Sequence, residues 1–322
     1  LNVTPLPFAN LTYDWFMSTT PGGPYTTPAG SGSSISTGVL TTGSYYYVCT
    51  TTCSNGGGNS TSAEYVLNVN ALGSGATYTI DNTLPNGGGN FASFTNAINA
   101  LNSTYLCGIS GPVVVNVTAG QSFNENPPAL TASGGSAINS ITFQKSGAGT
   151  NPLITPTGTA GTTDFGLCVT GGDFITFDGI DINASAVSAV EFGYLVRNAS
   201  TTNGANDVTI KNCAVSLNRN NTGSMGVVNS MATTVGAGFT PASALGTNNN
   251  FLVDNVTVTN CFAQGIRVEG NATFRPSGHI IQNSTVGAAY AGQPLPDIGN
   301  ASIASSPTGI YVANVDGVKV RN

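Results

Sequence analysis

The sequence has few charged side chains. Asp, Glu, Lys and Arg together make up 7% of its 322 residues, against roughly 25% in an average soluble domain. The eight Lys and Arg residues are scattered and are outnumbered by fourteen acidic residues, which gives a formal net charge of −6. Because such a chain offers no basic surface to a nucleic acid, we expect no nucleic-acid partner.

Long apolar runs and metal-binding spacings are also missing. No stretch reaches the roughly 18 apolar residues of a membrane-spanning helix, so we expect no membrane-spanning segment. Histidine occurs once, as His279, and the six cysteines lack the paired spacing of a zinc site. The sequence contains no Gly-x-Ser-x-Gly nucleophile elbow and no phosphate-binding loop. These absences favour a chain without a resident cofactor.

The residues that replace the charged ones are Gly, Ser, Thr and Asn. The chain has 42 glycines, and 40% of its residues are apolar. This composition suits extracellular β structure better than a cytosolic helical enzyme, because Thr favours strands and Gly and Asn favour turns. We therefore expect an all-β protein located outside the cell, at the cell surface.

A two-part motif recurs five times in the second half of the sequence. Its first part is a Gly followed by a short apolar strand, and its second part is an alternating strand that breaks at Asn or Gly and then resumes. The first part occupies residues 166–169, 193–196, 226–229, 265–268 and 309–312, and the second 175–179, 208–212, 251–255, 279–283 and 318–322. One repeat cannot bury its apolar side alone, but stacked repeats can. The motif therefore predicts a solenoid of parallel strands.

The strands align on the residue at which each one breaks, namely Gly179, Asn212, Asn255, Asn283 and Asn322. Two positions before this residue and three after it, the side chains are apolar and are expected to point inward. The position directly before it is polar and is expected to point outward. Asn tolerates the left-handed backbone of a sharp turn, and Gly adopts it without a Cβ. We interpret this column as a structural ladder whose stacked amides hydrogen-bond between coils.

A short helix is expected ahead of the solenoid. Phe91, Phe94, Ile98 and Leu101 fall on one helical face after the Gly-rich turn at residues 86–90. Such a helix would cover the N-terminal end of the stack, which would otherwise expose apolar side chains and bare strand edges.

Residues 1–72 contain short strands separated by Gly, Pro and Ser turns. The only Trp, Trp15, precedes Tyr47-Val-Cys49 by about thirty residues. This order resembles strands C and F of an immunoglobulin-like sandwich, where a Tyr two residues before the Cys forms the tyrosine corner. The earlier strands of such a sandwich are missing. We therefore expect a partial Ig-like β-sandwich over residues 1–72, with a generic β module as the alternative, and the solenoid over residues 73–322, truncated at its C-terminal end.

Residues 73–322 resemble right-handed parallel β-helix proteins. A short strand, a Phe-x-x-Phe helix, Gly111-Pro-Val-Val-Val-Asn-Val117 and Asn139-Ser-Ile-Thr-Phe-Gln144 follow one another. This order is similar to that of large cell-surface adhesins and gliding-type proteins of Bacteroidota, the cargo of the type IX secretion system. The resemblance implies an excerpt from a long secreted protein that is a partner of that secretion machinery.

Two disulfides are conceivable in an extracellular setting. Cys49 and Cys53 could close a small loop. Cys107 could be bridged to Cys168, which we expect on an outward column together with Leu195, Val228, Arg267 and Tyr311. Cys213, in contrast, falls on an inward column and is expected to be a free core thiol.

An acidic patch is the remaining candidate site. Asp173, Asp178 and Asp181 lie close together in sequence, with Lys211 one repeat further on. Paired carboxylates carry out glycoside hydrolysis, and clustered carboxylates bind Ca²⁺. Turn chemistry and solvation explain the same residues, and no Asp-x-Asp-x-Asp loop occurs. We therefore assign no catalytic and no metal site, and Ca²⁺ remains an alternative.

The function that the sequence favours is that of a non-enzymatic structural or adhesive segment of a long secreted cell-surface protein. Its expected partner is an extracellular polysaccharide or substratum. The alternative is a carbohydrate-active β-helix enzyme, a polysaccharide lyase or glycoside hydrolase, which needs acids and a base that meet on an outward groove. An ice- or surface-binding solenoid would need a regular outward Thr array, and the column that contains Cys168 is too mixed to supply one.

Overall fold

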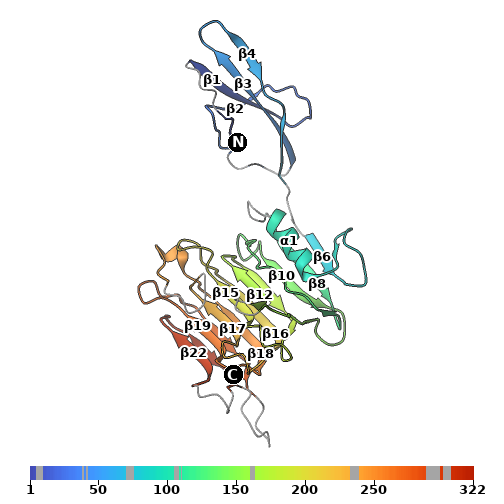
Figure 1. Ribbon diagram of the computed structural model, residues 1–322, viewed down its shortest axis with the longest axis vertical. Helices are drawn as coiled ribbons and strands as arrows, with labels where there is room; N and C mark the ends of the chain where they lie inside the picture. The colour runs from blue at the N-terminus through green and yellow to red at the C-terminus, as the bar shows by residue number, and fades with distance from the viewer. Residues whose placement is uncertain are drawn as a thin grey trace, which may run out of the picture. The chain divides into compact units, whose positions relative to one another are not determined.

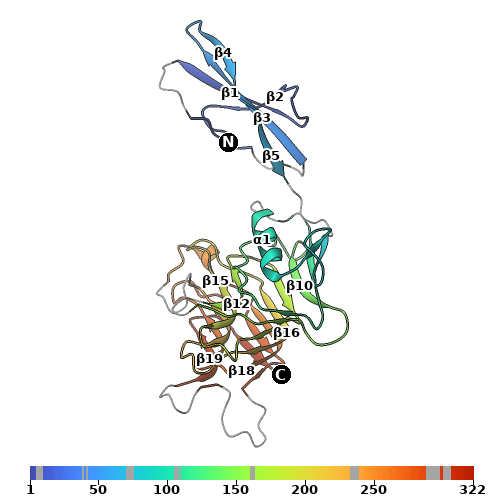
Figure 2. The ribbon, with the colours of Figure 1, turned by 45° about the vertical axis from the view of Figure 1, so that its right-hand side comes forward.

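The computed structural model describes residues 1–4, 10–37, 40, 43–69, 76–104, 109, 111–159, 164–232, 239–287, 298–299 and 306–322. The chain forms two compact units, Leu1–Ala71 and Leu72–Asn322, which we call unit 1 and unit 2. Their boundary lies one residue from the one expected from the sequence. Strands are the main regular secondary structure in both units, and the strands of unit 2 form large parallel sheets (Figures 1 and 2).

Unit 1 is an antiparallel sheet in the order β2–β1–β3–β4, with β5 also paired to β3. Its strands are β1 (Leu11–Ser18), β2 (Thr27–Ser31), β3 (Gly43–Cys53), β4 (Gly58–Thr61) and β5 (Tyr65–Val69). Trp15 on β1 pairs with Cys49 on β3, and both are buried together with Tyr45 and Tyr47. The Trp15 indole N–H donates to the carbonyl oxygen of Gly32 at 3.0 Å, so its buried polar atom is satisfied.

Unit 2 contains two sheets. The larger has the order β23–β20–β18–β16–β13–β10–β8–β6–β7, and the smaller has the order β12–β15–β17–β19–β22. From β12 onward the chain alternates between the two sheets, so each circuit, which we call a coil, adds a strand to each sheet. The strands are β6 (Ala76–Ile80), β7 (Asn90–Phe91), β8 (Val113–Thr118), β9 (Ser122–Phe123), β10 (Ile141–Ser146), β11 (Leu153–Ile154), β12 (Phe165–Thr170), β13 (Ile175–Asp178), β14 (Asp181–Asn183), β15 (Phe192–Arg197), β16 (Thr209–Ser216), β17 (Met225–Ser230), β18 (Leu252–Thr259), β19 (Gln264–Glu269), β20 (Ile280–Gln282), β21 (Thr285–Val286), β22 (Thr308–Ala313) and β23 (Lys319–Arg321).

The core of unit 2 is built from columns of apolar side chains that stack from coil to coil. Phe177, Ile210, Val253 and Ile281 pair in register along the larger sheet and are at most 2% exposed. This is the inward column expected from the sequence. Val320 is its last member, and it is 59% exposed because no further coil of the described chain packs against it.

The recurrent Gly of the motif marks the place where the two sheets approach each other most closely. A Cβ on Gly193 would lie 2.3 Å from Cγ1 of Val215, and a Cβ on Gly226 would lie 2.2 Å from Cγ1 of Val258. Gly265 meets Val286 in the same way, at 2.1 Å. Since these three glycines do not have a positive φ, lack of space rather than backbone conformation requires them.

The helix α1 (Phe94–Thr104) lies beside β6 and β8, at the N-terminal end of the stack (Figures 1 and 2). Phe94, Ile98 and Leu101 are at most 1% exposed and belong to the same core as the strands, as expected. Phe91 was expected on this helix but lies in β7. The Glu125 carboxylate accepts hydrogen bonds from the backbone N–H groups of Phe94 and Thr95, both at 2.9 Å, which explains why the helix begins there.

With 11 residues, α1 is short, and the described part of the chain contains no helix of the length and apolarity needed to cross a membrane.

The column of the smaller sheet that was expected to face solvent is buried, which corrects the expectation from the sequence. Cys168, Leu195 and Val228 do stack in register on the outer side of that sheet, but they are at most 1% exposed. Together with Phe192 they form a second apolar cluster. The smaller sheet therefore buries apolar side chains on both faces, as parallel sheets commonly do. Alternation alone could not distinguish a covered outer face from a solvated one.

The close approach at the Gly column predicts a specific loss of stability. Gly226→Ala should lower the free energy of unfolding by about 2 kcal/mol or more, because it forces a methyl group into filled space. Denaturant unfolding measures this. Gly309→Ala is the matched control, since it belongs to the same column but its nearest contact would be 3.7 Å away. It should change the unfolding free energy by less than about 1 kcal/mol, and equal losses in the two variants would contradict the close approach.

Candidate functional site

The outer face of the larger sheet carries two rows of side chains that run across the strands, and we call it the ladder face. Neighbouring strands stand about 4.8 Å apart, so each row has a regular spacing. Most of these side chains are half-buried between their neighbours, and none is aromatic. The first row is Thr77, Val114, Thr142, Thr176, Thr209, Leu252, Ile280 and Lys319, and the second is Thr79, Asn116, Gln144, Asp178, Lys211, Asp254, Gln282 and Arg321.

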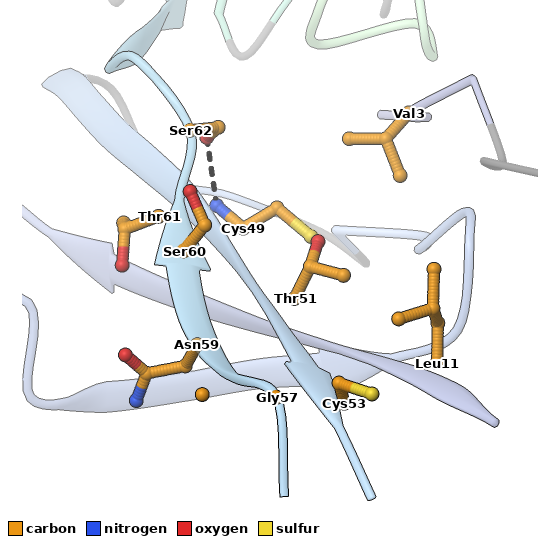
Figure 3. A pocket seen from close by; sticks show the side chains of 11 residues that line it. Val3, Leu11, Cys49, Thr51, Cys53, Gly57, Asn59, Ser60, Thr61 and Ser62 are labelled. Atoms are coloured by element: carbon orange, nitrogen blue, oxygen red, sulfur yellow. Dashed lines mark hydrogen bonds between the residues drawn. The ribbon is translucent and has the colours of Figure 1, made fainter. Parts of the chain in front are cut away.

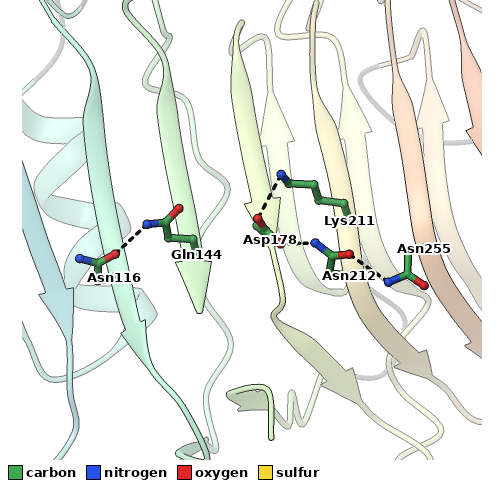
Figure 4. A network of polar contacts seen from close by, with 6 residues as sticks. All are labelled: Asn116, Gln144, Asp178, Lys211, Asn212 and Asn255. Carbon is green, nitrogen blue, oxygen red and sulfur yellow. Dashed lines mark hydrogen bonds and ion pairs between the residues drawn. The ribbon is translucent and has the colours of Figure 1, made fainter. Parts of the chain in front are cut away.

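The side chains of the second row bind one another (Figure 4). The Gln144 side-chain amide donates to Oδ1 of Asn116 at 3.0 Å, and Nζ of Lys211 lies 3.1 Å from Oδ2 of Asp178. Further along, hydrogen bonds from Gln282 and Asn283 hold the pKa of Asp254 below its usual value. Asp178 and Lys211 form an ion pair, whereas Asp254 and Arg321 contact neutral amides. The two negative and two positive side chains of the row cancel, so the face has little net charge to offer a partner.

The expected ladder of turns borders this face. Gly179, Asn212, Asn255 and Asn283 have φ angles of 70°, 56°, 53° and 51°, which is the left-handed region. The Asn212 amide donates to Oδ1 of Asp178 at 2.6 Å, and the Asn255 amide donates to Oδ1 of Asn212 at 2.9 Å (Figure 4). Asn322, the last residue, is exposed and is not among the residues with positive φ. The ladder fixes the turn of each coil and ties it to the preceding one.

A second ladder, not found in the sequence analysis, lies at the other end of these strands. Oδ1 of Asp173 accepts hydrogen bonds from the backbone and side-chain N–H groups of Asn206, at 2.7 and 3.0 Å. Oδ1 of Asn206 accepts the equivalent pair from Asn249, and Oδ1 of Asn249 accepts the Ser277 N–H. Each of these residues stands two positions before an inward apolar column. A polar residue at that offset is the signal that could have revealed the ladder.

The three aspartates of the acidic patch have separate partners. Asp173 belongs to the second ladder, where burial raises its pKa. Asp178 is bound by Lys211 and Asn212. Asp181 accepts hydrogen bonds from the Asn151 amide and the Ala214 N–H, both at 2.8 Å. The described residues contain no group of three or more His, Cys, Asp and Glu side chains that could hold a metal ion. The three aspartates therefore make separate structural contacts and do not form a common site.

The possible disulfide between Cys49 and Cys53 is a second correction. Cys49 and Cys53 are free thiols four residues apart on the extended strand β3. Their Cα atoms are about 13 Å apart at 3.3 Å per residue, whereas a disulfide requires less than about 7 Å. Cys168 is also a free thiol, and Cys107 lies outside the described residues. Cys213 is free and buried, as expected, and burial raises its pKa to about 12.

Cys49 and Cys53 line a cleft of about 360 Å³ in unit 1. Figure 3 shows Cys49, Thr51 and Cys53 along β3, facing Val3 and Leu11. None of the residues that line the cleft is charged. Burial raises the pKa of the Cys49 thiol, so it stays protonated and is a poor nucleophile. The cleft therefore suits an uncharged group better than an ion.

Two further polar residues of unit 2, Arg267 and His279, make contacts within the fold. Arg267 lies within hydrogen-bonding distance of Glu269, at 2.5 and 3.1 Å, and its guanidinium lies 4.8 Å from the centre of the Tyr311 ring. His279 is fully buried. Comparisons with protein-family models, with curated proteins and with solved structures found no match to this chain. The function must therefore be inferred from the geometry, in which the ladder face is the most regular surface.

The structural role of the ladder of turns can be tested at Asn212. Asn212→Ala should lower the free energy of unfolding by about 2 kcal/mol, through the left-handed backbone and the lost amide hydrogen bonds. Asn212→Gly removes only the hydrogen bonds and should cost about 1 kcal/mol less. Denaturant unfolding of both variants provides the measurement. If Ala and Gly were tolerated equally, the left-handed turn would not be the reason for Asn at this position.

Proposed function

We propose that unit 2 is a right-handed parallel β-helix and that unit 1 is a partial immunoglobulin-like module. The alternation of the chain between two parallel sheets supports the first part, and parallel crossovers are right-handed in about 98% of cases. The antiparallel pairing of Trp15 with Cys49, and the burial of Tyr47 two residues before that Cys, support the second part.

We further propose that the chain is a non-catalytic, adhesive segment of a long secreted cell-surface protein. It resembles the adhesins and gliding-type proteins of Bacteroidota, and the ladder face would bind an extracellular polysaccharide or substratum. The observation that carries this proposal is the register of the strands. Through this register, the outward side chains form two straight rows that cross β6, β8, β10, β13, β16, β18, β20 and β23.

The chemistry of the face suits an uncharged, extended partner. Hydroxyl and amide groups recur at the strand spacing, and the methyl groups of Thr142, Thr176 and Thr209 lie beside them. The polar side chains are held by contacts such as Gln144 to Asn116, so little side-chain entropy is lost on binding. Each repeat contributes little affinity, but a polymer that follows the row engages many repeats at once. A neutral polysaccharide has this combination of repeating hydroxyl groups and length.

The alternative is a carbohydrate-active enzyme, and one pair of carboxylates has the spacing that such an enzyme needs. Asp164 and Glu191 directly precede β12 and β15, where Phe165 pairs with Phe192. Strands about 4.8 Å apart place such carboxylates near the 5–5.5 Å of a retaining glycosidase. Both Glu191 oxygens are already bound, however, by the Asp164 N–H at 2.9 Å and the Asn221 amide at 3.2 Å. This pair is better explained as a link between coils.

Binding can be tested by co-sedimentation of the purified chain with insoluble polysaccharides, both neutral (cellulose, chitin) and anionic (alginate, pectate). We expect retention on a neutral polymer without release of reducing ends or unsaturated products. The double variant Thr176→Arg/Thr209→Arg should weaken retention at least tenfold, about 1.4 kcal/mol, because it places two bulky charges on the ladder face.

Thr257→Arg is the matched control. Thr257 is an exposed, outward residue of β18, but it lies beyond the turn at Asn255 and so outside the two rows. It should leave retention unchanged. Product release would favour the enzyme instead, and equal losses in the control and the double variant would exclude the ladder face as the binding surface.

A further inference from the structure

His279 lies in an otherwise apolar column inside unit 2. Each member of the column stands one residue before the first row of the ladder face. The members are Ile175, Val208, Phe251, His279 and Val318. The N–H of Ile280 donates to the carbonyl of Phe251, and the N–H of Lys319 donates to the carbonyl of His279, both at 2.9 Å. His279 therefore sits between the coil of β18 and the coil of β23. Its side chain is 0% exposed, as are those of Ile175 and Val208.

The hydrogen bond that the imidazole accepts requires its neutral form. Nδ1 accepts the backbone N–H of Phe251 at 3.4 Å, so the single proton of the neutral ring is on Nε2. Nε2 is buried and finds no hydrogen-bond partner within the described part of the chain. A second proton can only go to Nδ1, where it would meet the Phe251 N–H and leave that group without an acceptor.

Among the residues that the structure describes, no charged group compensates an imidazolium at this place. Its neighbours in the column are Phe251, which is 1% exposed, and Val318, which packs against the apolar core of unit 2. The charged residues of the flanking segments are engaged or exposed at the surface. Asp316 lies 3.6 Å from Arg275, Asp207 accepts the Asn250 amide, Asp254 accepts the Asn283 amide, and Lys319 is exposed.

We propose that His279 is an acid-sensitive latch for the C-terminal coils of unit 2. Protonation at Nδ1 breaks the contact with Phe251 and places a charge among apolar side chains, so the coils of β18, β20 and β23 separate. The N-terminal coils contain no histidine and stay closed. Opening exposes Phe251 and Ile281. The C-terminal coils of unit 2 therefore present a different surface at acidic pH than at neutral pH.

The direction of the pH dependence follows from the burial. Desolvation lowers the pKa of His279 from 6.5 to about 4. Between these values the open form binds a proton that the closed form does not. The closed form is therefore fully favoured above pH 6.5, and the opening equilibrium rises by up to about tenfold per pH unit as the pH falls towards 4. Asp173 has a raised pKa, so its protonation favours the folded form and acts in the opposite direction.

Hydrogen exchange measured by mass spectrometry tests the latch, with rates corrected for the intrinsic pH dependence of exchange. Between pH 7.5 and pH 5.0, peptides that cover residues 251–259, 279–286 and 308–322 should lose at least tenfold in protection. Peptides that cover residues 113–118 and 141–146 should not change. A uniform loss over both sets would overturn the proposal.

Two variants separate the latch from general acid sensitivity. His279→Leu makes the column fully apolar, and His279→Gln keeps an oxygen acceptor for the Phe251 N–H but does not titrate. Either variant that folds at pH 7.5 should retain its C-terminal protection at pH 5.0. The same acid response in a folded variant as in the unchanged chain would show that another group is responsible.

Discussion

The fold of unit 2 depends on the contact between the Gly column of one sheet and the Val column of the other. At Gly193, Gly226 and Gly265 the two sheets are too close to admit even a methyl group. This approach brings the side chains of the two sheets into direct contact, in line with the close packing of protein interiors. It recurs at the same position in three successive coils, and strands that stack in register place equivalent residues in rows. The regular outer surface is thus a consequence of an internal packing constraint.

Two polar ladders convert this packing into a fixed register. The ladder through Asn212 and Asn255 lies at the left-handed residue within β16 and β18, and the ladder through Asn206 and Asn249 lies just before these strands. A strand that slipped by one residue would turn its apolar side chains outward and break both ladders. The ladder face is held rigidly for this reason, and rigidity combined with low charge is what makes it suited to an extended neutral partner.

Much of this could be inferred from the sequence, because the inward columns and the Asn turns each depend on neighbouring residues in the chain. The parts that failed depend on contacts that periodicity does not encode. Cys168 stands at an outward position of its strand, yet a second apolar cluster covers it. Cys49 and Cys53 are near in sequence, yet an extended strand holds them apart. Asp173 looked like part of an acidic patch because its partner Asn206 is a full coil away.

On the ladder face, outward residues of successive coils stand in one straight row. Pulsed electron spin resonance between nitroxide labels measures this directly, with one label at Val114 and the second at Thr209, Leu252 or Ile280. These positions are three, four and five strands away in the larger sheet. If the residues stand in one row, the mean distance increases by about 4.8 Å at each step, from about 14 to about 24 Å. Distances that do not increase in equal steps would contradict the stacked register.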